Sequence, residues 1–252
     1  MAPALVGQQV NYFDRDSAAY AVFRPEYDAS LAESLAALSR GRATAIDVGC
    51  GNGQLARLLA KHYECVIALD LSENQLAYAS GPANVQFTLG SAERLTVQDC
   101  SVDLIVAAQA AHWFDLPTFY AEAQRVGRDG AVIALLTYGV PSIQGPANAV
   151  LEQGYWNDLH HFWPTERRHV ETGYADLLFP FQELRMRDFE YERQMTVNEF
   201  IAYVSTWSAF KEASDRGAGY QFDAFFERLR EAWPDGEQQR VRWPLSTRTG
   251  LI

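Results

Sequence analysis

Residues 46–53 read Ile-Asp-Val-Gly-Cys-Gly-Asn-Gly and stand between an apolar strand pattern at 43–48 and a helical pattern at 54–62. Glycine lets the backbone turn tightly and approach a ligand closely, so a glycine-rich turn from strand to helix is typical of a nucleotide-type cofactor site. The stretch therefore predicts the first unit of an alternating α/β fold and a binding site at its first turn.

The spacing of these glycines separates two classes of cofactor. A dinucleotide fingerprint reads G-x-G-x-x-G, but its third glycine would fall on Gln54, and Gly49, Gly51 and Gly53 follow a G-x-G-x-G spacing with Asp47 before them. A dinucleotide brings a pyrophosphate, which needs N–H donors and no nearby carboxylate. S-adenosylmethionine brings a cationic amino group and a sulfonium, which suit an acid. The stretch therefore favours S-adenosylmethionine.

A second acid follows at the end of the next strand pattern, where Asp70 closes the apolar run 65–70 and Leu71 comes directly after it. An acid about 20 residues after the glycines is placed to bind both hydroxyls of a ribose. A nicotinamide site would use the same acid, so Asp70 predicts an adenosyl cofactor without choosing between the two classes.

Strand and helix patterns alternate over the first part of the chain and continue into the second. Strand patterns cover residues 43–48, 65–70, 85–89, 102–108, 131–138, 182–194 and 240–249. Helical patterns cover residues 54–62, 73–79, 116–126, 147–162, 170–178, 198–210 and 220–233, and a further one runs from Ser30, its expected N-cap, towards Gly41. This order predicts an α/β, Rossmann-like fold: a seven-stranded, mostly parallel sheet with helices on both faces and helical cap elements from the C-terminal half.

Composition excludes several functions for this chain of 252 residues. Its formal net charge of -11 opposes binding to nucleic acids or to anionic membranes, both of which need clustered Lys and Arg. The 3 cysteines are scattered and fit neither a disulfide framework nor a metal site. The N-terminus lacks a secretory pattern, and no apolar run is long enough to span a membrane. We therefore expect a cytoplasmic protein that acts on a small molecule and holds no metal.

Two turns after later strands carry further candidates, because ligands bind beyond the carboxyl ends of parallel strands. The turn 90–93 contains Ser91, Ala92 and Glu93, which either reach the adenine or, for Ser91, cap an ordinary turn. The turn after residue 108 contains Gln109, His112 and Trp113, predicted beside cofactor and acceptor. For His112 three roles remain open: a buried satisfied histidine, an acceptor contact and a general base.

Aromatic residues are concentrated in the second half of the chain, where the acceptor pocket is expected. Tyr155, Trp156 and Trp207 are candidates to line it, and core packing is the alternative for each. The run Arg167–His169 either recognises an anionic acceptor or forms a solvated charged surface.

The chain resembles class I S-adenosylmethionine-dependent methyltransferases, in the small-molecule group called type 11 and in the branch that includes trans-aconitate methyltransferases. The resemblance is carried by the motifs at 20–25, 47–53, 70–72, 90–93, 109–115, 125–130, 155–156, 179–181 and 206–208. It implies that Tyr20 and Arg24 hold the methionine end of the cofactor, because an N-terminal helix covers it in such enzymes. Ser91 departs from the family pattern, which often has Asp there, so Ala92 and Glu93 are expected to replace that contact.

These observations predict three segments and one activity. Residues 1–40 form N-terminal helices covering the cofactor, 41–139 the cofactor-binding core, and 140–252 the acceptor-side cap with the last strands. The expected activity is methyl transfer from S-adenosylmethionine, with S-adenosylhomocysteine as product, to an oxygen of a small metabolite by a monomer or homodimer. N-methylation of a heterocycle and a catalytically inactive binding protein are the alternatives.

Overall fold

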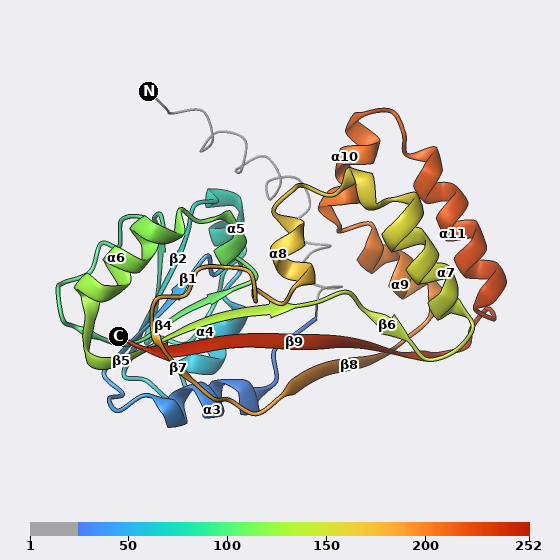
Figure 1. Ribbon diagram of the computed structural model, residues 1–252. Helices are drawn as coiled ribbons and strands as arrows, with labels where there is room; N and C mark the ends of the chain where they lie inside the picture. The colour runs from blue at the N-terminus through green and yellow to red at the C-terminus, as the bar shows by residue number, and fades with distance from the viewer. Residues whose placement is uncertain (1–24) are drawn as a thin grey trace.

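Five parallel strands form the centre of the sheet in the computed structural model, which describes residues 25–252 (Figure 1). They are β1 (Thr44–Val48), β2 (Cys65–Asp70), β3 (Val85–Leu89), β4 (Val102–Ala108) and β5 (Gly127–Tyr138). Their order is β3-β2-β1-β4-β5. The chain reverses direction across the sheet between β1 and β4, which is where open α/β sheets bind their ligands. The predicted bounds 65–70, 85–89 and 102–108 are confirmed.

Helices cover both faces of this sheet because β4 is apolar on both sides. Leu104 and Val106 pack with α3 (Ala29–Leu38) and α4 (Gln54–Leu59), whereas Ile105 and Ala107 pack with α6 (Leu116–Val126) on the opposite face. Successive side chains of a strand point to opposite faces, so one buried strand can anchor two helical layers. Two short helices follow the neighbouring strands: α5 (Glu73–Ala77) and η1 (Ala111–Trp113).

The helix α3 begins two residues earlier than predicted. Its N-cap is Asp28, whose Oδ1 accepts a hydrogen bond from the backbone N–H of Ser30 at 2.8 Å, so the assignment of Ser30 as N-cap is wrong. Both residue types cap helices well, and the extended backbone at position 28 decides between them. Leu31 and Leu35 bury one side of α3 against the sheet. Tyr20 and Arg24 lie outside the described residues.

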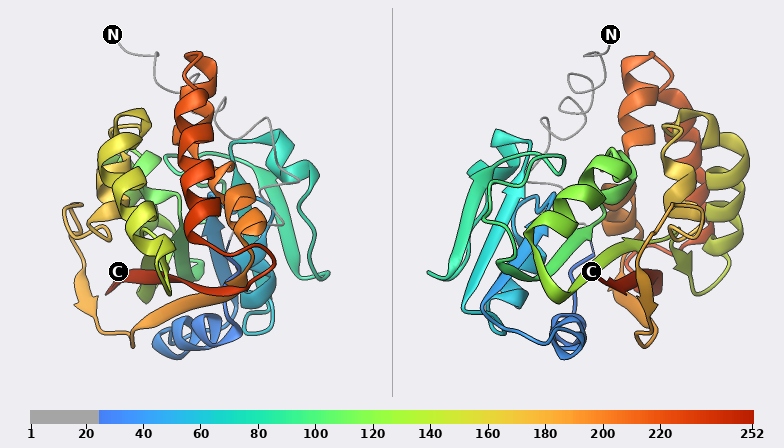
Figure 2. Two further views of the ribbon diagram at one scale, coloured as in Figure 1. Left: turned by 90° about the vertical axis from the view of Figure 1, so that its right-hand side faces the viewer. Right: turned by 60° about the vertical axis from the view of Figure 1, so that its left-hand side comes forward.

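The long antiparallel strand β9 (Gln239–Leu251) connects the core sheet to the second half of the molecule (Figures 1 and 2). Its last part pairs with β5 on one side and with β7 (Gln182–Leu184) on the other, and its first part pairs with β6 (Ser142–Ile143) and β8 (Phe189–Met195). In the described part of the chain the sheet therefore has nine strands, not the predicted seven. The predicted strand 182–194 is interrupted between β7 and β8, and β6 is too short to show a sequence pattern.

A group of helices, called the cap here, packs beside the core at the far end of β9 (Figure 2). The cap consists of α7 (Ala147–Gln153), η2 (Gly154–Asp158), η3 (His160–Phe162), α9 (Val197–Val204), α10 (Ser208–Asp215) and α11 (Tyr220–Ala232). The short helix α8 (Arg167–Glu171) lies between cap and core (Figure 1). The predicted helix 170–178 is wrong in its bounds because Gly173 and Tyr174 adopt positive φ angles of 62° and 66°. The predicted helix 198–210 divides at Trp207, whose extended backbone starts α10.

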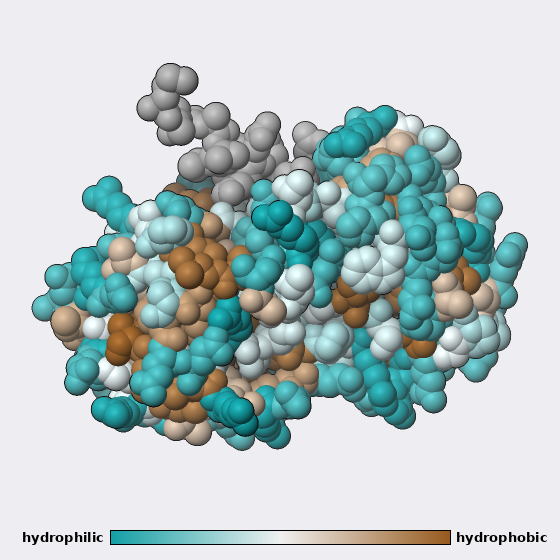
Figure 3. Space-filling view, viewed as in Figure 1, coloured by the Kyte–Doolittle hydropathy of each residue, from teal (hydrophilic) through white to brown (hydrophobic). Residues whose placement is uncertain are grey.

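The face of the cap seen in Figure 3 is mostly hydrophilic, and the large aromatic side chains of the cap are gathered in its core. None of the helices among residues 25–252 is both long enough and apolar enough to cross a bilayer.

Candidate active site

The glycine loop after β1 adopts a conformation that explains each of its glycines. Gly49, Gly51 and Gly53 have φ angles of 72°, 55° and 83°, a region that side chains with a Cβ rarely adopt. A Cβ on Gly49 would lie 2.5 Å from the Cβ of Ala110, and one on Gly53 would lie 2.5 Å from the ring of Phe87. The backbone N–H of Gly49 donates to the carbonyl of Leu69 at 2.8 Å and so ties the loop to β2. The loop is therefore held close to the ends of β1, β2 and β4.

Asp47 is a buried acid with no internal partner. Its side chain is 1% exposed, and neither carboxylate oxygen accepts a hydrogen bond from any described residue. Burial raises the pKa of this carboxyl to about 7; the amide of Ala56 opposes the rise and the charge of Asp70 adds to it. An unsatisfied buried carboxylate is costly, and such groups in native proteins serve a function or bind a cation. Asp47 therefore fits a ligand that carries a positive charge.

Asp70 organises the loop and keeps acceptor capacity for a ligand. One carboxylate oxygen accepts from the backbone N–H of Gly51 at 2.8 Å, and the other accepts from that of Ser72 at 2.9 Å. Burial raises the pKa of Asp70, and these N–H groups counteract the rise. Since each carboxylate oxygen has two lone pairs, both can also accept from the neighbouring hydroxyls of a ribose.

A cavity opens beside these two acids, at the carboxyl ends of β1, β2, β4 and β5. It encloses about 1180 Å³ of empty space, counted out to its open mouth. Nine predicted residues lie in its wall: Asp47, Gly49, Gly51, Asp70, Leu71, Ala92, Glu93, Gln109 and Trp113. The prediction did not include several other wall residues, among them Tyr27, Cys50, Ser72, Gln75, Phe114 and Tyr138. Tyr138 ends β5, so the rule on strand ends could have identified it.

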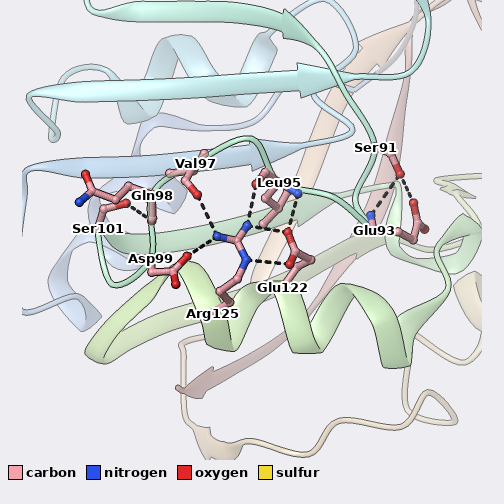
Figure 4. A network of polar contacts seen from close by, with 9 residues as sticks. All are labelled: Ser91, Glu93, Leu95, Val97, Gln98, Asp99, Ser101, Glu122 and Arg125. Atoms are coloured by element: carbon pink, nitrogen blue, oxygen red, sulfur yellow. Dashed lines mark hydrogen bonds and ion pairs between the residues drawn. The ribbon is translucent and has the colours of Figure 1, made fainter.

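Three predicted residues, Gly53, Ser91 and His112, do not line the cavity. Gly53 is the N-cap of α4, and Ser91 stands in the turn after β3. The Ser91 hydroxyl donates to the carboxylate of Glu93 (Figure 4). The other carboxylate oxygen of Glu93 accepts from the backbone N–H of Asp115 at 3.0 Å. Glu93 thus ties the turn after β3 to the start of α6. An adenine contact by Ser91 stays a prediction, as does the placement of His112 against the acceptor.

Arg125 clamps the segment after this turn onto α6 (Figure 4). Its guanidinium donates to both carboxylate oxygens of Glu122, to Asp99 at 2.6 Å and to the carbonyls of Leu95 and Val97. Glu122 in turn accepts from the backbone N–H of Leu95 at 2.8 Å. This bidentate and charge-assisted set fixes the loop that carries Ala92 and Glu93 to the cavity.

Gln109 enters the wall with a strained backbone. Its φ is 56°, although it is neither glycine nor asparagine. Its amide nitrogen donates to the carbonyl of Tyr138 at 3.1 Å, and its amide oxygen accepts from the hydroxyl of Thr137 at 3.1 Å. Backbone strain of this kind persists where the surroundings impose it and is concentrated at ligand sites. Gln109 therefore joins the ends of β4 and β5 beside the cavity.

His112 lies one residue behind the cavity wall. Its Nδ1 is 2.7 Å from the phenol oxygen of Tyr174, and its ring centroid is 5.0 Å from that of Trp113, which lines the cavity. Burial, together with the charges of Arg167 and His169, lowers the pKa of His112 to about 3. The imidazole is therefore neutral at physiological pH. If the Tyr174 hydroxyl donates to Nδ1, the ring proton is on Nε2; if Nδ1 donates to the hydroxyl, Nε2 carries no proton.

The cap aromatics proposed from the sequence are not in the cavity wall. Tyr155 and Trp207 are buried in the apolar core of the cap, with ring centroids 5.6 Å apart. Trp156 lies on the outer side, where it is 47% exposed and stacks on His160. Core packing, the alternative named for these residues, describes Tyr155 and Trp207, while Trp156 lies on the surface.

Comparisons with known proteins agree with this geometry. Residues 46–135 match the family model described as a methyltransferase domain, Methyltransf_11. A Dictyostelium discoideum protein named as a methyltransferase is 34% identical over 202 residues, which are 79% of this chain and 77% of the relative. A malonyl-[acyl-carrier protein] O-methyltransferase of Pectobacterium atrosepticum is 38% identical over 94 residues, covering 36% of this chain and 37% of the relative.

A solved structure extends the likeness to the cap. The structure, titled as a type II methyltransferase from Anaeromyxobacter dehalogenans, has a TM-score of 0.83 and 39% identity, and the match covers 91% of this chain and 98% of that chain. The glycine loop, the two acids and the strand order stand in the segment that the family model matches. The chain belongs to the class I S-adenosylmethionine-dependent methyltransferases, in the type 11 group.

Proposed function

We propose that the cavity beside Asp47 binds S-adenosylmethionine and that the protein catalyses methyl transfer to an oxygen of a small-molecule acceptor, leaving S-adenosylhomocysteine. The observation that carries this proposal is the buried carboxylate of Asp47, which has no partner among residues 25–252. When bound, the cofactor supplies a methyl group that its positive sulfur has already activated.

Each part of the wall has a chemical reason to hold part of this cofactor. Asp47 would accept from the cationic amino group, and Asp70 would accept from the two ribose hydroxyls. The close backbone at Gly49 and Gly51 leaves room for the ligand, since neither residue has a side chain. Leu71 and the turn at Ala92 would contact the adenosine end.

The N-terminal segment adds two cofactor contacts to this proposal. By the resemblance stated above, Tyr20 and Arg24 close over the methionine end, where an arginine would pair with the cofactor carboxylate. These contacts are an expectation from the family pattern, since both residues precede the described part of the chain.

The residues around the remaining space can align an acceptor and exclude water. Tyr27, Trp113, Phe114 and Tyr138 bring aromatic side chains to the cavity wall. In-line displacement at an activated methyl depends mainly on this alignment and on a dry site. A carboxylate acceptor is already a nucleophile and needs no base. The low pKa of His112, about 3, makes it a weak base, which favours such an acceptor.

Oxygen as the acceptor atom draws support from a relative. The protein of Pectobacterium atrosepticum that matches part of this chain is named an O-methyltransferase. Its match extends over 94 residues, which are 36% of this chain. The acceptor half has to be tested directly.

Calorimetry with S-adenosylhomocysteine tests the cofactor site. We expect the wild type to bind it and Asp47→Asn to bind it much more weakly, while the matched control Asp158→Asn, in the cap, binds as the wild type does. No detectable binding to the wild type would refute the proposal. Transfer of radiolabelled methyl to a panel of acids, phenols and heterocycles then tests the acceptor atom: product on nitrogen alone would contradict the O-methyl assignment.

A further inference from the structure

Gln109 is a wall residue whose side-chain amide the surrounding fold holds in one orientation. Its amide nitrogen donates to the carbonyl of Tyr138 at 3.1 Å, and its amide oxygen accepts from the hydroxyl of Thr137 at 3.1 Å. The reversed amide would place its oxygen against the carbonyl oxygen of Tyr138, and both of these atoms only accept hydrogen bonds. The end of β5 therefore decides which end of the amide is the nitrogen.

This orientation leaves one N–H of Gln109 for a ligand. An amide nitrogen carries two hydrogens, and the bond to Tyr138 uses one of them. Among residues 25–252 no acceptor meets the other hydrogen, and the side chain is half-buried in the cavity wall. The amide oxygen is turned towards Thr137, which is fully buried and does not line the cavity. Gln109 therefore presents a hydrogen-bond donor to the cavity, and its acceptor is already occupied.

The backbone of Gln109 also indicates a role in binding. Its φ of 56° lies in the left-handed region, which glutamine seldom adopts. The backbone N–H donates to the carbonyl of Leu136 at 2.8 Å, so the bonding between β4 and β5 extends to this strained residue. Strain of this kind persists where the surroundings impose it and is common at ligand sites. The chain keeps an amide side chain at a position where glycine would fit the backbone better.

Gln109 lies beside the acid that is proposed to hold the amino group of the cofactor. Asp47 and Val106 are partners in the pairing of β1 with β4, and neighbouring strands lie about 4.8 Å apart. The turns after these two strands pack closely together, since a Cβ on Gly49 would lie 2.5 Å from the Cβ of Ala110. Asp47 and Gln109 both line the cavity. A ligand group next to the one that Asp47 binds can therefore reach the amide of Gln109.

The methionine portion of the cofactor carries such a group. Its amino group and its carboxylate are attached to the same carbon, so an amino group held at Asp47 confines the carboxylate to the immediate surroundings. Asp47 repels this carboxylate when it is ionised, and an amide oxygen facing it would add to the repulsion. The N–H of Gln109 has the opposite polarity and can donate to it. The fixed orientation of the amide is therefore the one that suits a carboxylate.

We propose that Gln109 binds the carboxylate of the cofactor's methionine portion through its free side-chain N–H, and that Thr137 is a positioning residue for this contact. Such a hydrogen bond is charge-assisted and stronger than one between neutral groups. The donor is oriented before the ligand binds, so little side-chain entropy is lost. The contact adds to the one expected from Arg24, and the inference rests on the proposed binding of S-adenosylmethionine in the cavity.

The other amide side chains among the described wall residues are placed differently. Asn52 belongs to the glycine loop and Gln54 follows it, and no hydrogen bond within residues 25–252 fixes either amide. Gln75 belongs to α5, which follows β2 and so lies after the strand of Asp70, the residue proposed at the ribose. An amide that turns freely presents its oxygen as readily as its nitrogen. Gln109 combines a fixed donor with a position next to Asp47.

Calorimetry with two ligands tests this contact. They are S-adenosylhomocysteine and its decarboxylated analogue S-adenosyl-3-thiopropylamine, which keeps the amino group and lacks the carboxylate. We expect the wild type to bind S-adenosylhomocysteine at least about tenfold more tightly than the analogue. Gln109→Met keeps the length of the side chain without its amide. Its affinity for S-adenosylhomocysteine should fall by about 10- to 100-fold, while that for the analogue changes by less than about threefold. The matched control Gln153→Met, whose amide donates to Asp158 in the cap, should behave as the wild type.

Two substitutions of Thr137 separate positioning from packing. Thr137→Ser keeps the hydroxyl and loses a methyl group, whereas Thr137→Val keeps the shape and loses the hydroxyl. Positioning predicts wild-type affinity for S-adenosylhomocysteine in Thr137→Ser and a loss of about 3- to 10-fold in Thr137→Val, with binding of the analogue unchanged in both. A loss in Thr137→Ser together with wild-type binding in Thr137→Val would overturn the positioning role.

The ratio of the two affinities separates this inference from the function on which it rests. An unchanged ratio in Gln109→Met, whether both affinities are kept or both fall, would overturn the inference, and so would a wild type that does not distinguish the two ligands. If Gln109→Met folds poorly, Gln109→Gly removes the amide and suits the positive φ angle, and the same ratio decides. A wild type that binds neither ligand would instead refute the proposed function.

Discussion

The Nδ1 atom of His112 lies 2.7 Å from the Oη atom of Tyr174, and this contact joins the turn after β4 to the turn after α8. Tyr174 is fully buried and has a φ of 66°, so a strained backbone holds its ring in place. Burial raises the pKa of the phenol, which therefore stays protonated at physiological pH. The hydroxyl fixes the imidazole next to Trp113.

Tyr174→Phe removes this contact with little change in volume. We expect kcat for methyl transfer to fall about 5- to 10-fold, corresponding to the loss of about one hydrogen bond, and the affinity for S-adenosylhomocysteine to stay unchanged. Tyr120→Phe is the matched control, since its phenol donates to the carbonyl of Leu178 away from the cavity. Equal effects of the two substitutions on kcat would show that only stability is involved.

The ionisation of His112 predicts a pH dependence of stability. Its pKa in the folded protein is about 3, below the ordinary 6.5, so the unfolded chain takes up a proton that the folded one refuses. This residue therefore stabilises the fold less as the pH falls from about 6.5 towards 3. His112→Gln should lose less free energy of unfolding than the wild type between pH 7.5 and pH 5 in urea titrations. Parallel losses would show that His112 titrates normally.

Asp47 has the opposite linkage. Its pKa is raised from 3.8 to about 7, so the folded protein without a ligand holds this proton more tightly than the unfolded chain does. The resulting stabilisation is fully present below pH 3.8 and is lost as the pH rises through 7. A cationic ligand needs the ionised form and must displace the proton. The affinity for S-adenosylhomocysteine should therefore weaken about tenfold per pH unit below 7. Calorimetry from pH 5 to pH 8 measures this slope, which Asp47→Asn should abolish.

Asp70→Ala should weaken binding of S-adenosylhomocysteine by about 100-fold. It removes the acceptor for the ribose hydroxyls and releases the N–H groups of Gly51 and Ser72 that hold the loop. Asp158→Ala, which breaks an exposed ion pair with Arg228 in the cap, should leave the dissociation constant unchanged. If Asp70→Ala bound as tightly as the wild type, the ribose assignment would be wrong.

Arg125→Gln should loosen the loop between β3 and β4. Its guanidinium is about one-third exposed, and solvent therefore screens the two ion pairs. We expect the free energy of unfolding to fall by about 1 kcal/mol. That corresponds to a lower Tm by about 2–4 °C. Hydrogen exchange should rise at Leu95 and Val97. Arg216→Gln, which breaks the pair between Glu212 and the C-cap residue of α10, should change neither measurement.

The core was predictable from the sequence because local pattern and tertiary environment agree there. The strand 102–108 is apolar except for Asp103 and is buried on both faces, so its bounds follow from the sequence pattern. The acids Asp47 and Asp70 were found in the same way, because strand ends meet at one edge of a parallel sheet.

The cap was less predictable because tertiary contacts decide where its elements end. The helical pattern continues through Trp207, yet the ring of that residue is only 2% exposed, and its extended backbone divides the predicted helix. Aromatic composition alone also does not distinguish residues of a hydrophobic core from residues that line a pocket. Tyr155 and Trp207 pack inside, whereas Tyr27 and Tyr138 reach the cavity from positions that only the folded chain brings together.

The continuity of β9 limits how the protein can be recombined. Its first residues belong to the ladder with β6 and β8, and its last residues fill the space between β5 and β7. A chimaera that exchanges acceptor halves between relatives therefore cannot be joined at residue 140 alone. A second crossover within residues 239–251 has to preserve the register of this strand, or the graft will carry a foreign strand into the recipient's sheet.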